Sequence, residues 1–304
     1  MCSANQTKPL ADKRIGILGK GGAGKSTVVV LLAQALAEHG YHVCVLDADS
    51  TNVGIHQAMG LSESPTPLIE YYGGTVFSGG AVTCPVDDPT SLPEAEIFLD
   101  ELPQQYYVQD PRGVLLLVAG KIGGKGPGAG CDGPVSKIAR DLKIRRCGEY
   151  PVTLVDLKAG MEDSARGVLT SLDWAIVVVD PTNASIQLAA DMKQMVEQIR
   201  AGIPPATDHL QDPELVETAR RVFREAKIKG VLCVLNRVRD DEMESHMRRR
   251  LEERRVAPIG VIHEDASIAM SWLAGTPLDT TSTTKDIESI LNDVEAAELI
   301  SGVS

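Results

Sequence analysis

The chain has 304 residues, of which 43% are hydrophobic and 24% charged, and it carries a formal net charge of −12. A chain of this length buries a substantial core without disulfides or structural metals. The negative charge argues against nucleic acid and membrane partners, because a protein that binds nucleic acid or anionic lipid needs a dominant basic face.

The start of the chain lacks the apolar core of a signal peptide, and no apolar run is long enough to cross a bilayer. These features favour a cytoplasmic location. In a reducing compartment the six cysteines are expected to be free thiols rather than a disulfide framework. Cys44 and Cys233 lie inside apolar strand-like runs, which predicts that both are small core residues.

Short apolar segments rich in β-branched residues alternate along the chain with segments of helical periodicity. The pattern begins with a predicted strand at Arg14–Leu18 and a predicted helix at Ser26–His39, which Gly40 would terminate. The further predicted strands are His42–Asp47, Val114–Val118, Val152–Asp156, Trp174–Asp180, Gly230–Asn236 and Ile259–Ile262. Helical patterns separate most of them, as at Ile186–Ile199 and Pro213–Ala226. Such alternation is typical of an α/β fold with a doubly wound, mostly parallel sheet flanked by helices.

The stretch from about Leu61 to Arg112 interrupts this alternation with many Gly, Pro and Asp residues. We predict that residues 61–112 form an irregular insertion with short helices on one side of the sheet. Because α/β folds of this size often form one domain, residues 1–304 are expected to be a single domain.

A glycine-rich sequence from Gly19 to Thr27 follows the first predicted strand and opens the first predicted helix. It matches the phosphate-binding pattern G-x-x-x-x-G-K-[ST] in the strand–loop–helix context that the pattern requires. The backbone N–H groups expected to surround a phosphate belong to Gly21, Gly22, Ala23 and Gly24. Lys25 would bridge the β- and γ-phosphates, and the Ser26 hydroxyl would hold Mg²⁺. The motif, including Thr27, therefore predicts a Mg-dependent nucleotide site.

The residue after the first glycine of this loop is a second lysine, Lys20, which gives the pattern KGGxGK[ST]. With this pattern the chain resembles the deviant Walker A family of P-loop ATPases, in the SIMIBI class. That family includes the nitrogenase iron protein, the MinD and ParA ATPases of septum placement and plasmid partition, and the CooC-type nickel-insertion ATPase of carbon monoxide dehydrogenase. The resemblance implies ATP as the nucleotide, a homodimer that closes around it, and a Lys20 that reaches the partner's nucleotide.

Two further predicted strands end in carboxylates. Asp47 and Asp49 stand two residues apart on an extended segment, so their side chains are expected to point the same way, towards the phosphates. This segment corresponds to switch I of the family, and the resemblance gives Asp49 the position of the residue that orients the attacking water. Asp156 ends an apolar strand, the Walker B arrangement, and is expected to hold Mg²⁺ through a water together with Ser26 and Asp49. The segment Ala159–Glu162 resembles switch II.

A later strand ends in Asn236, whose side-chain amide can both donate to and accept from a purine edge. GTPases carry an aspartate three residues after such an asparagine. Here that position holds Arg239, which has only donors. ATP is therefore predicted in preference to GTP.

The glycine-rich segment from Gly123 to Gly133 closely resembles the nickel-insertion ATPase, and the resemblance spans nearly the whole chain. That ATPase carries Cys-x-Cys here, and two copies across the dimer axis form a four-thiolate metal site. This sequence keeps Cys131 but has Gly133 at the second position. Two alternatives stay open: Cys131 binds Ni or Zn at the dimer interface, with Asp132 completing a mixed ligand set, or it is an inert thiol.

The resemblance implies an ATPase whose dimer cycle assists metal insertion into, or maturation of, a metalloenzyme client. A positioning or partition switch of the MinD/ParA type is an alternative. Against it, the C-terminal run from Asp286 to Glu298 is acidic. The basic run from Arg248 to Arg255 is interleaved with Glu252 and Glu253, which is typical of a solvated helix face. An ATP-gated electron donor is a third reading, but the chain has no cysteine between Cys147 and Cys233 for a bridging iron–sulfur cluster.

Overall fold

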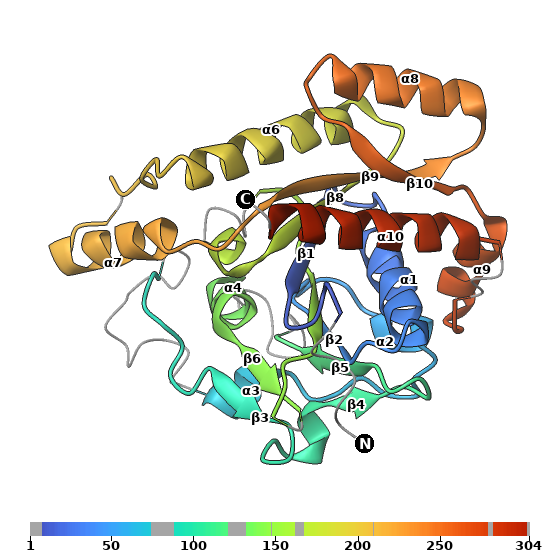
Figure 1. Cartoon of the computed structure of the whole chain (residues 1–304). Helices are drawn as coiled ribbons and strands as arrows, with labels where there is room; N and C mark the ends of the chain where they lie inside the picture. The colour runs from blue at the N-terminus through green and yellow to red at the C-terminus, as the bar shows by residue number, and fades with distance from the viewer. Residues whose placement is uncertain are drawn as a thin grey trace.

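The computed structural model describes residues 8–73, 88–120, 132–146, 148–161, 167–208, 210–278 and 282–302. A twisted sheet forms the centre of the molecule, with helices on both of its faces (Figure 1). The helices of the main body are α1 (Lys25–Glu38), α2 (Ile55–Ala58), α4 (Asp132–Asp141), η4 (Val168–Ser171), α6 (Asn183–Arg200), α7 (Pro213–Arg224), α8 (Asp241–Glu252), α9 (Ala266–Ala274) and α10 (Thr284–Ser301). The strands of the main body are β1 (Arg14–Gly19), β2 (Val43–Asp47), β5 (Leu115–Val118), β6 (Lys143–Arg145), β7 (Val152–Asp156), β8 (Trp174–Val179), β9 (Gly230–Val238) and β10 (Pro258–His263).

Eight strands form the main sheet in the order β10-β9-β8-β1-β7-β2-β5-β4, where β4 is the short strand Val108–Gln109. Every neighbouring pair is parallel except the short edge strand β4 and its neighbour β5. The first strand lies in the middle, with Arg14 opposite Thr153 of β7 and Ile15 opposite Trp174 of β8. This topology confirms the predicted doubly wound sheet, and ligands of such sheets bind at the carboxyl ends of the strands where the winding direction reverses.

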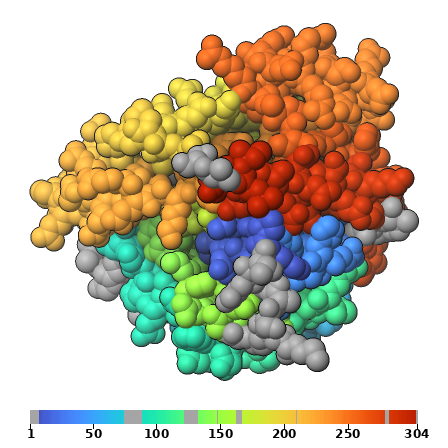
Figure 2. Space-filling model, viewed as in Figure 1, coloured from blue at the N-terminus to red at the C-terminus, as the bar shows by residue number. Residues whose placement is uncertain are grey.

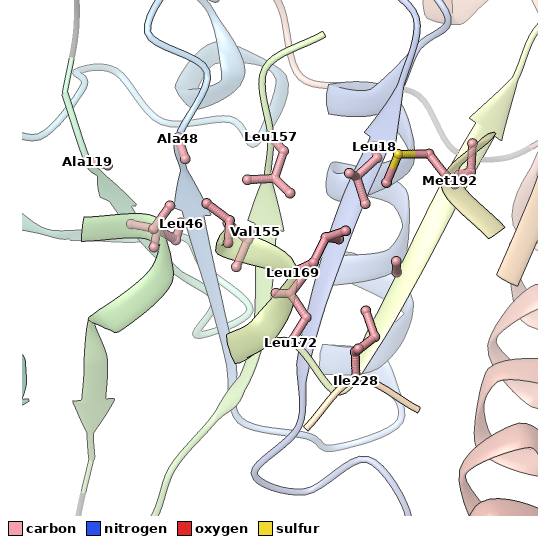
Figure 3. Close-up of a cluster of buried hydrophobic side chains, with 14 of the residues drawn as sticks. Leu18, Leu46, Ala48, Ala119, Val155, Leu157, Leu169, Leu172, Met192 and Ile228 are labelled. Carbon is pink, nitrogen blue, oxygen red and sulfur yellow. The ribbon is translucent and has the colours of Figure 1, made fainter. Parts of the chain in front are cut away.

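Side chains of the strands alternate between two buried clusters, one on each face of the sheet. One cluster, drawn in Figure 3, contains Leu18, Leu46 and Val155 and is completed by α4, α6 and α8. The other contains Ile17 and Leu154 and is covered by α1 and α10. Because both faces are covered, the strands are apolar along their whole length, and this continuity made them recognisable in the sequence. Cys44 and Cys233 are buried in the first cluster, as predicted, and burial raises the pKa of each thiol to about 12.

The segment predicted as an insertion contains the short helices α3 (Leu68–Tyr72) and η3 (Gln104–Tyr106). It also contains two strands that the sequence analysis did not predict, β3 (Glu96–Phe98) and β4 (Val108–Gln109). The strand β4 pairs antiparallel with β5 as the edge of the main sheet, and β3 pairs with β6 in a separate two-stranded sheet. Strands of two or three residues are too short to display the alternation by which a strand is recognised.

The acidic C-terminal helix α10 is part of the core rather than a free amphipathic segment. Its Ile287, Ile290, Leu291 and Val294 are buried, and it lies next to α1 in Figure 1 and on the surface above it in Figure 2. Among the described residues, no helix is both long and apolar enough to span a membrane.

Candidate nucleotide-binding site

The loop between β1 and α1 takes its shape from glycines with positive φ angles. Gly22 and Gly24 have φ angles of 80° and 94°, which side chains other than glycine adopt at a cost. A Cβ atom on Gly24 would also lie only 2.2 Å from Nδ2 of Asn236. The loop is closed by a hydrogen bond from the Ala23 backbone N–H to the Lys20 carbonyl at 3.1 Å. The loop thus has the strand–loop–helix geometry that the phosphate-binding motif predicted.

A cavity of about 660 Å³ opens beside this loop, at the carboxyl ends of the strands. The loop contributes to its wall the glycines 21, 22 and 24 together with Lys25, Ser26 and Thr27. Asp49 and Asn236, predicted from two other strand ends, also line the cavity. Ala23, predicted as a further backbone donor, is fully buried and does not line the cavity, and its N–H donates to the Lys20 carbonyl. The fold therefore brings together residues that are scattered over more than two hundred positions of the sequence.

The hydroxyl of Ser26 joins three elements of the site. It donates a hydrogen bond to Oδ2 of Asp156 at 2.6 Å and accepts one from Nδ2 of Asn52, also at 2.6 Å. Ser26 lies in the first turn of α1, Asp156 ends β7, and Asn52 lies in the loop that follows β2. Asn52 was not singled out in the sequence, although it lies three residues after Asp49 in the same loop.

Asp156 is fully buried, with 0% of its surface exposed. Burial first, and then repulsion from Asp47, raises its pKa to about 7, while the hydrogen bond from Ser26 and the charge of Lys25 act in the opposite direction. Among the described residues no donor reaches its second oxygen, Oδ1, although that atom is buried. An unpaired carboxylate oxygen beside a serine hydroxyl is what a hard cation such as Mg²⁺ binds, directly or through water.

Asp49 is buried at the cavity wall, and its position is fixed by its own loop. Its Oδ1 atom accepts hydrogen bonds from the backbone N–H of Thr51 at 3.0 Å and from the Thr51 hydroxyl at 2.7 Å. The backbone N–H of Asp49 in turn donates to Oδ1 of Asp47 at 3.1 Å. Repulsion from Asp47 and Asp49 contributes to the raised pKa of Asp156, so the three carboxylates form one electrostatic cluster around the buried Lys25.

Lys20 lies in the loop but does not line the cavity of its own chain. Its side chain is half-buried, and its backbone carbonyl helps to close the loop. This placement separates the two lysines of the loop: Lys25 belongs to the cavity, whereas Lys20 lies outside it.

The end of β9 contacts the phosphate-binding loop and also lines the cavity. Nδ2 of Asn236 donates to the carbonyl of Ala23 at 2.7 Å, so this amide supports the loop in addition to lining the cavity. Arg237, with a positive φ of 59°, lines the cavity next to it. Arg239, used above to argue against guanine, instead lines a separate groove of about 870 Å³ between α6 and α8. No carboxylate therefore faces the cavity from position 239.

Another part of the cavity wall comes from the end of β10 and from α9; the sequence predicted a strand at Ile259–Ile262, but no residue of either element was assigned to the site. Ile268, Ala269 and Trp272 form its apolar part, and the polar residues His263, Glu264 and Asp265 line the cavity beside them. The indole Nε1 of Trp272 donates to the hydroxyl of Thr27 at 3.0 Å. Trp272 is one of two tryptophans in the chain, but nothing in its local sequence links it to residue 27.

The residues predicted around the dimer axis are only partly described. Cys131 and Glu162 lie outside the described residues, so the structure does not test either prediction. Asp132, proposed above as a further metal ligand, is described: its carboxylate accepts hydrogen bonds from Ser50 at 2.5 Å and from Lys158. In the part of the chain that the structure covers, no three His, Cys, Asp or Glu side chains are grouped as a metal site.

Comparison with known proteins assigns this architecture to a family. The CobQ/CobB/MinD/ParA nucleotide binding domain matches residues 17–278. The chain belongs to this family. Over 188 residues it is 36% identical to an uncharacterized ATP-binding protein of Methanocaldococcus jannaschii, which covers 61% of this chain and 74% of that protein. Over 196 residues it is 29% identical to the carbon monoxide dehydrogenase accessory protein CooC of Rhodospirillum rubrum, covering 61% of this chain and 70% of CooC.

The family's fold is also found in solved structures. The septum site-determining protein MinD of Pyrococcus horikoshii OT3, complexed with Mg-ADP, superposes with a TM-score of 0.56 at 18% identity, over 95% of this chain and 98% of that one. At this level of identity the likeness concerns the fold alone. The matched family is one of nucleotide-binding domains, and the proteins similar to this chain include an ATP-binding protein and CooC.

Proposed function

We propose that the chain is an ATPase that binds ATP with Mg²⁺ in this cavity and hydrolyses it to ADP and phosphate. The observation that carries the proposal is the bond between Ser26 and Asp156, made beside Lys25, a cation with only 6% of its surface exposed. A buried lysine at the start of a helix, next to a hydroxyl and an unpaired carboxylate oxygen, is suited to a triphosphate and its cation.

The roles of the side chains follow from their places in the cavity. Lys25 and the backbone N–H groups of the loop hold the β- and γ-phosphates and offset the negative charge that develops on them. Asp49, held by Thr51, orients a water for attack on the γ-phosphorus. The new bond joins this water to phosphorus, one proton of the water passes to an oxygen of the phosphate product, the bond between the γ-phosphorus and the β–γ bridging oxygen breaks, and ADP leaves with that oxygen.

Ser26 and Asp156 are the residues proposed to hold Mg²⁺, which supplies charge neutralisation between the β- and γ-phosphates when it is bound. Asn52 orients the Ser26 hydroxyl by donating to it. Because the Asp156 carboxylate is fully buried, its charged form depends on positive neighbours, and Lys25 is one that the fold provides.

We further propose that two copies of the chain close around two ATP molecules, with each Lys20 acting on the partner's nucleotide. The position of Lys20 in the loop but outside its own cavity supports this arrangement. The similarity to CooC supports a role in maturation of a cytoplasmic metalloenzyme, in which ATP binding and hydrolysis close and open the dimer. Cys131 is the proposed contact with a transition metal, nickel or zinc, across the dimer axis.

The proposal is tested with protein purified anaerobically and closed with a non-hydrolysable ATP analogue. ATP turnover, the mass of the complex and the metal content per dimer are measured in parallel. We expect the unaltered chain to hydrolyse ATP and Lys25→Ala to lose this activity. We also expect a dimer that forms with nucleotide and is lost in Lys20→Ala. About one nickel or zinc per dimer, removed by Cys131→Ala, would support the metallochaperone role. Hydrolysis without any bound metal would restrict the function to a nucleotide switch, and iron with matching sulfide would favour an electron donor.

A further inference from the structure

A single carboxylate at the start of α4 binds both loops that border the phosphate end of the cavity. Oδ1 of Asp132 accepts a hydrogen bond from the hydroxyl of Ser50 at 2.5 Å, and Oδ2 accepts one from the ammonium group of Lys158. Ser50 directly follows Asp49, and Lys158 comes two residues after Asp156. Asp132 therefore bonds to residues that lie one and two positions after the two proposed site carboxylates.

The two loops leave neighbouring strands at the same level. In the register of β2 and β7, Asp47 lies opposite Asp156, and the backbone N–H of Ala48 donates to the carbonyl of Asp156 at 2.9 Å. Beyond this point the strands end, and Asp132 adds a side-chain connection between the loops that continue from them. A change in the distance between the loops must change at least one bond to this carboxylate.

Asp132 is carried by a helix that is firmly attached to the sheet. Arg14 of β1 donates to the carbonyls of Ala139 at 2.6 Å and Leu142 at 2.5 Å, at the other end of α4. The middle of α4 is fixed by Lys137, which is buried and bonds to the carboxylate of Asp88 at 2.9 Å. The helix lies on the face of the sheet opposite α1 (Figure 1). Asp132 is thus a fixed acceptor against which the two loops are aligned.

We propose that Asp132 and Lys158 are positioning residues for ATP hydrolysis: they hold the loop of Asp49 against the loop that follows Asp156. The inference rests on the proposed ATPase function and deepens it. Neither residue lines the nucleotide cavity, so neither touches the substrate. Both act through Ser50 and the backbone on the orientation of Asp49, because displacement of a catalytic group by a fraction of an ångström slows a reaction without abolishing substrate binding.

The test compares Asp132→Asn, Lys158→Met and the double variant with the unaltered chain, measuring kcat, KM and the affinity for a fluorescent ATP analogue. The expected result is a loss of about tenfold in kcat for each single variant, with nucleotide affinity changed by less than about twofold. The double variant should lose no more than either single one, because both substitutions break the same connection. Lys158→Arg, which keeps the positive charge, should restore most of the turnover.

The chain contains a matched control for an ion pair that only stabilises the fold. Lys158 and Asp132 have side-chain exposures of 25% and 13%, and Lys229 and Glu298 have exposures of 26% and 10%. Lys229 lies just before β9, at the end of the sheet away from the cavity. Lys229→Met is expected to lower the melting temperature and to leave kcat unchanged.

Equal effects of Lys158→Met and Lys229→Met on kcat would overturn the inference, as would additive losses in the double variant. If Asp132→Asn does not fold, Ser50→Ala tests the same connection with a smaller change, and an unaltered kcat there would contradict the inference. Absence of ATP hydrolysis by the unaltered chain would overturn the proposed function and this inference with it. Normal hydrolysis by the unaltered chain combined with normal kcat in the variants would overturn the inference alone.

Discussion

The indole Nε1 of Trp272 on α9 donates a hydrogen bond to the hydroxyl of Thr27 on α1, 245 residues earlier in the chain, at 3.0 Å. This bond connects the apolar wall of the cavity with the first turn of the helix that begins at the phosphate-binding loop. The bond therefore fixes the position of the Trp272 ring relative to the phosphate-binding loop, and the two line the same cavity.

Trp272 should report nucleotide binding by fluorescence. The only other tryptophan, Trp174, is buried and bonded to Glu298 far from the cavity, so it should not respond. ATP is expected to change the emission of the unaltered chain and not that of Trp272→Phe, whose affinity for ATP should fall about fivefold through loss of the bond to Thr27. An unchanged signal on titration of the unaltered chain to saturation, checked by calorimetry, would show that the base does not reach α9.

Asn52 should control the dependence of turnover on magnesium. Its amide orients the Ser26 hydroxyl, so Asn52→Ala is expected to raise the Mg²⁺ concentration for half-maximal hydrolysis about fivefold, the equivalent of roughly one hydrogen bond. Asn183→Ala is the matched control, since Asn183 is an exposed residue that bonds Arg250 outside the cavity. Identical magnesium curves for the two variants would refute the assignment of Asn52.

Gly24 should tolerate alanine less well than Gly22 does. Both have positive φ angles, which cost a side chain roughly 1–2 kcal/mol, but nothing lies within 4 Å of a Cβ on Gly22, whereas a Cβ on Gly24 would lie 2.2 Å from Asn236. Thermal unfolding without nucleotide should therefore show a larger loss for Gly24→Ala. Adding Asn236→Ala should recover part of that excess, and no recovery would mean that backbone strain alone explains the loss.

Glu298 should make stability depend on pH. Burial alone would raise its pKa, but hydrogen bonds from Lys229 and Trp174, with the charges of Lys13 and Lys229, outweigh burial and leave the pKa below its ordinary value. A carboxylate with a lowered pKa contributes stability above its unfolded pKa and loses it as pH falls through the folded value.

Removal of the Glu298 charge should therefore matter at neutral pH and much less in acid. Glu298→Gln is expected to lower the free energy of unfolding by about 2 kcal/mol at pH 7, since charged hydrogen bonds contribute about that much. Urea unfolding at pH 7 and pH 3.5 measures the difference. A loss of equal size at both pH values would indicate packing rather than charge as its cause.

The parts of the fold and site that sequence predicts are those governed by local patterns. Continuous apolar runs located β7 and, within one or two residues of their ends, β1 and β8. The phosphate-binding loop was recognised because glycines, lysine and hydroxyl residues must follow one another for the backbone to surround a phosphate. Their assembly with Asp49 and Asn236 followed from the rule that strands of a parallel sheet end at the same edge.

The remaining features depend on contacts between distant residues, which carry no local pattern. The bond between Trp272 and Thr27, the bond between Asn52 and Ser26, and the shared acceptor Asp132 each become visible only when the elements are packed. Arg239 is an example of a prediction from spacing that the structure does not match. Its position three residues after Asn236 placed it beside the base, but in the structure it lines the groove between α6 and α8. The spacing gives the number of residues between Arg239 and Asn236, but not the direction that the chain takes after β9 ends.

The central position of β1 has a consequence for the order in which the protein is made. The strand that carries the phosphate-binding loop needs β7 and β8 as neighbours, and the loop is supported by Asn236, which is 213 residues beyond Ala23. At about 5–20 residues per second a ribosome takes roughly 10–40 s to synthesise that interval. The later of these two neighbours, β8, ends at Val179, so β1 can join a sheet before Asn236 has been made, whereas the loop lacks the support of the Asn236 amide until the whole interval has been translated.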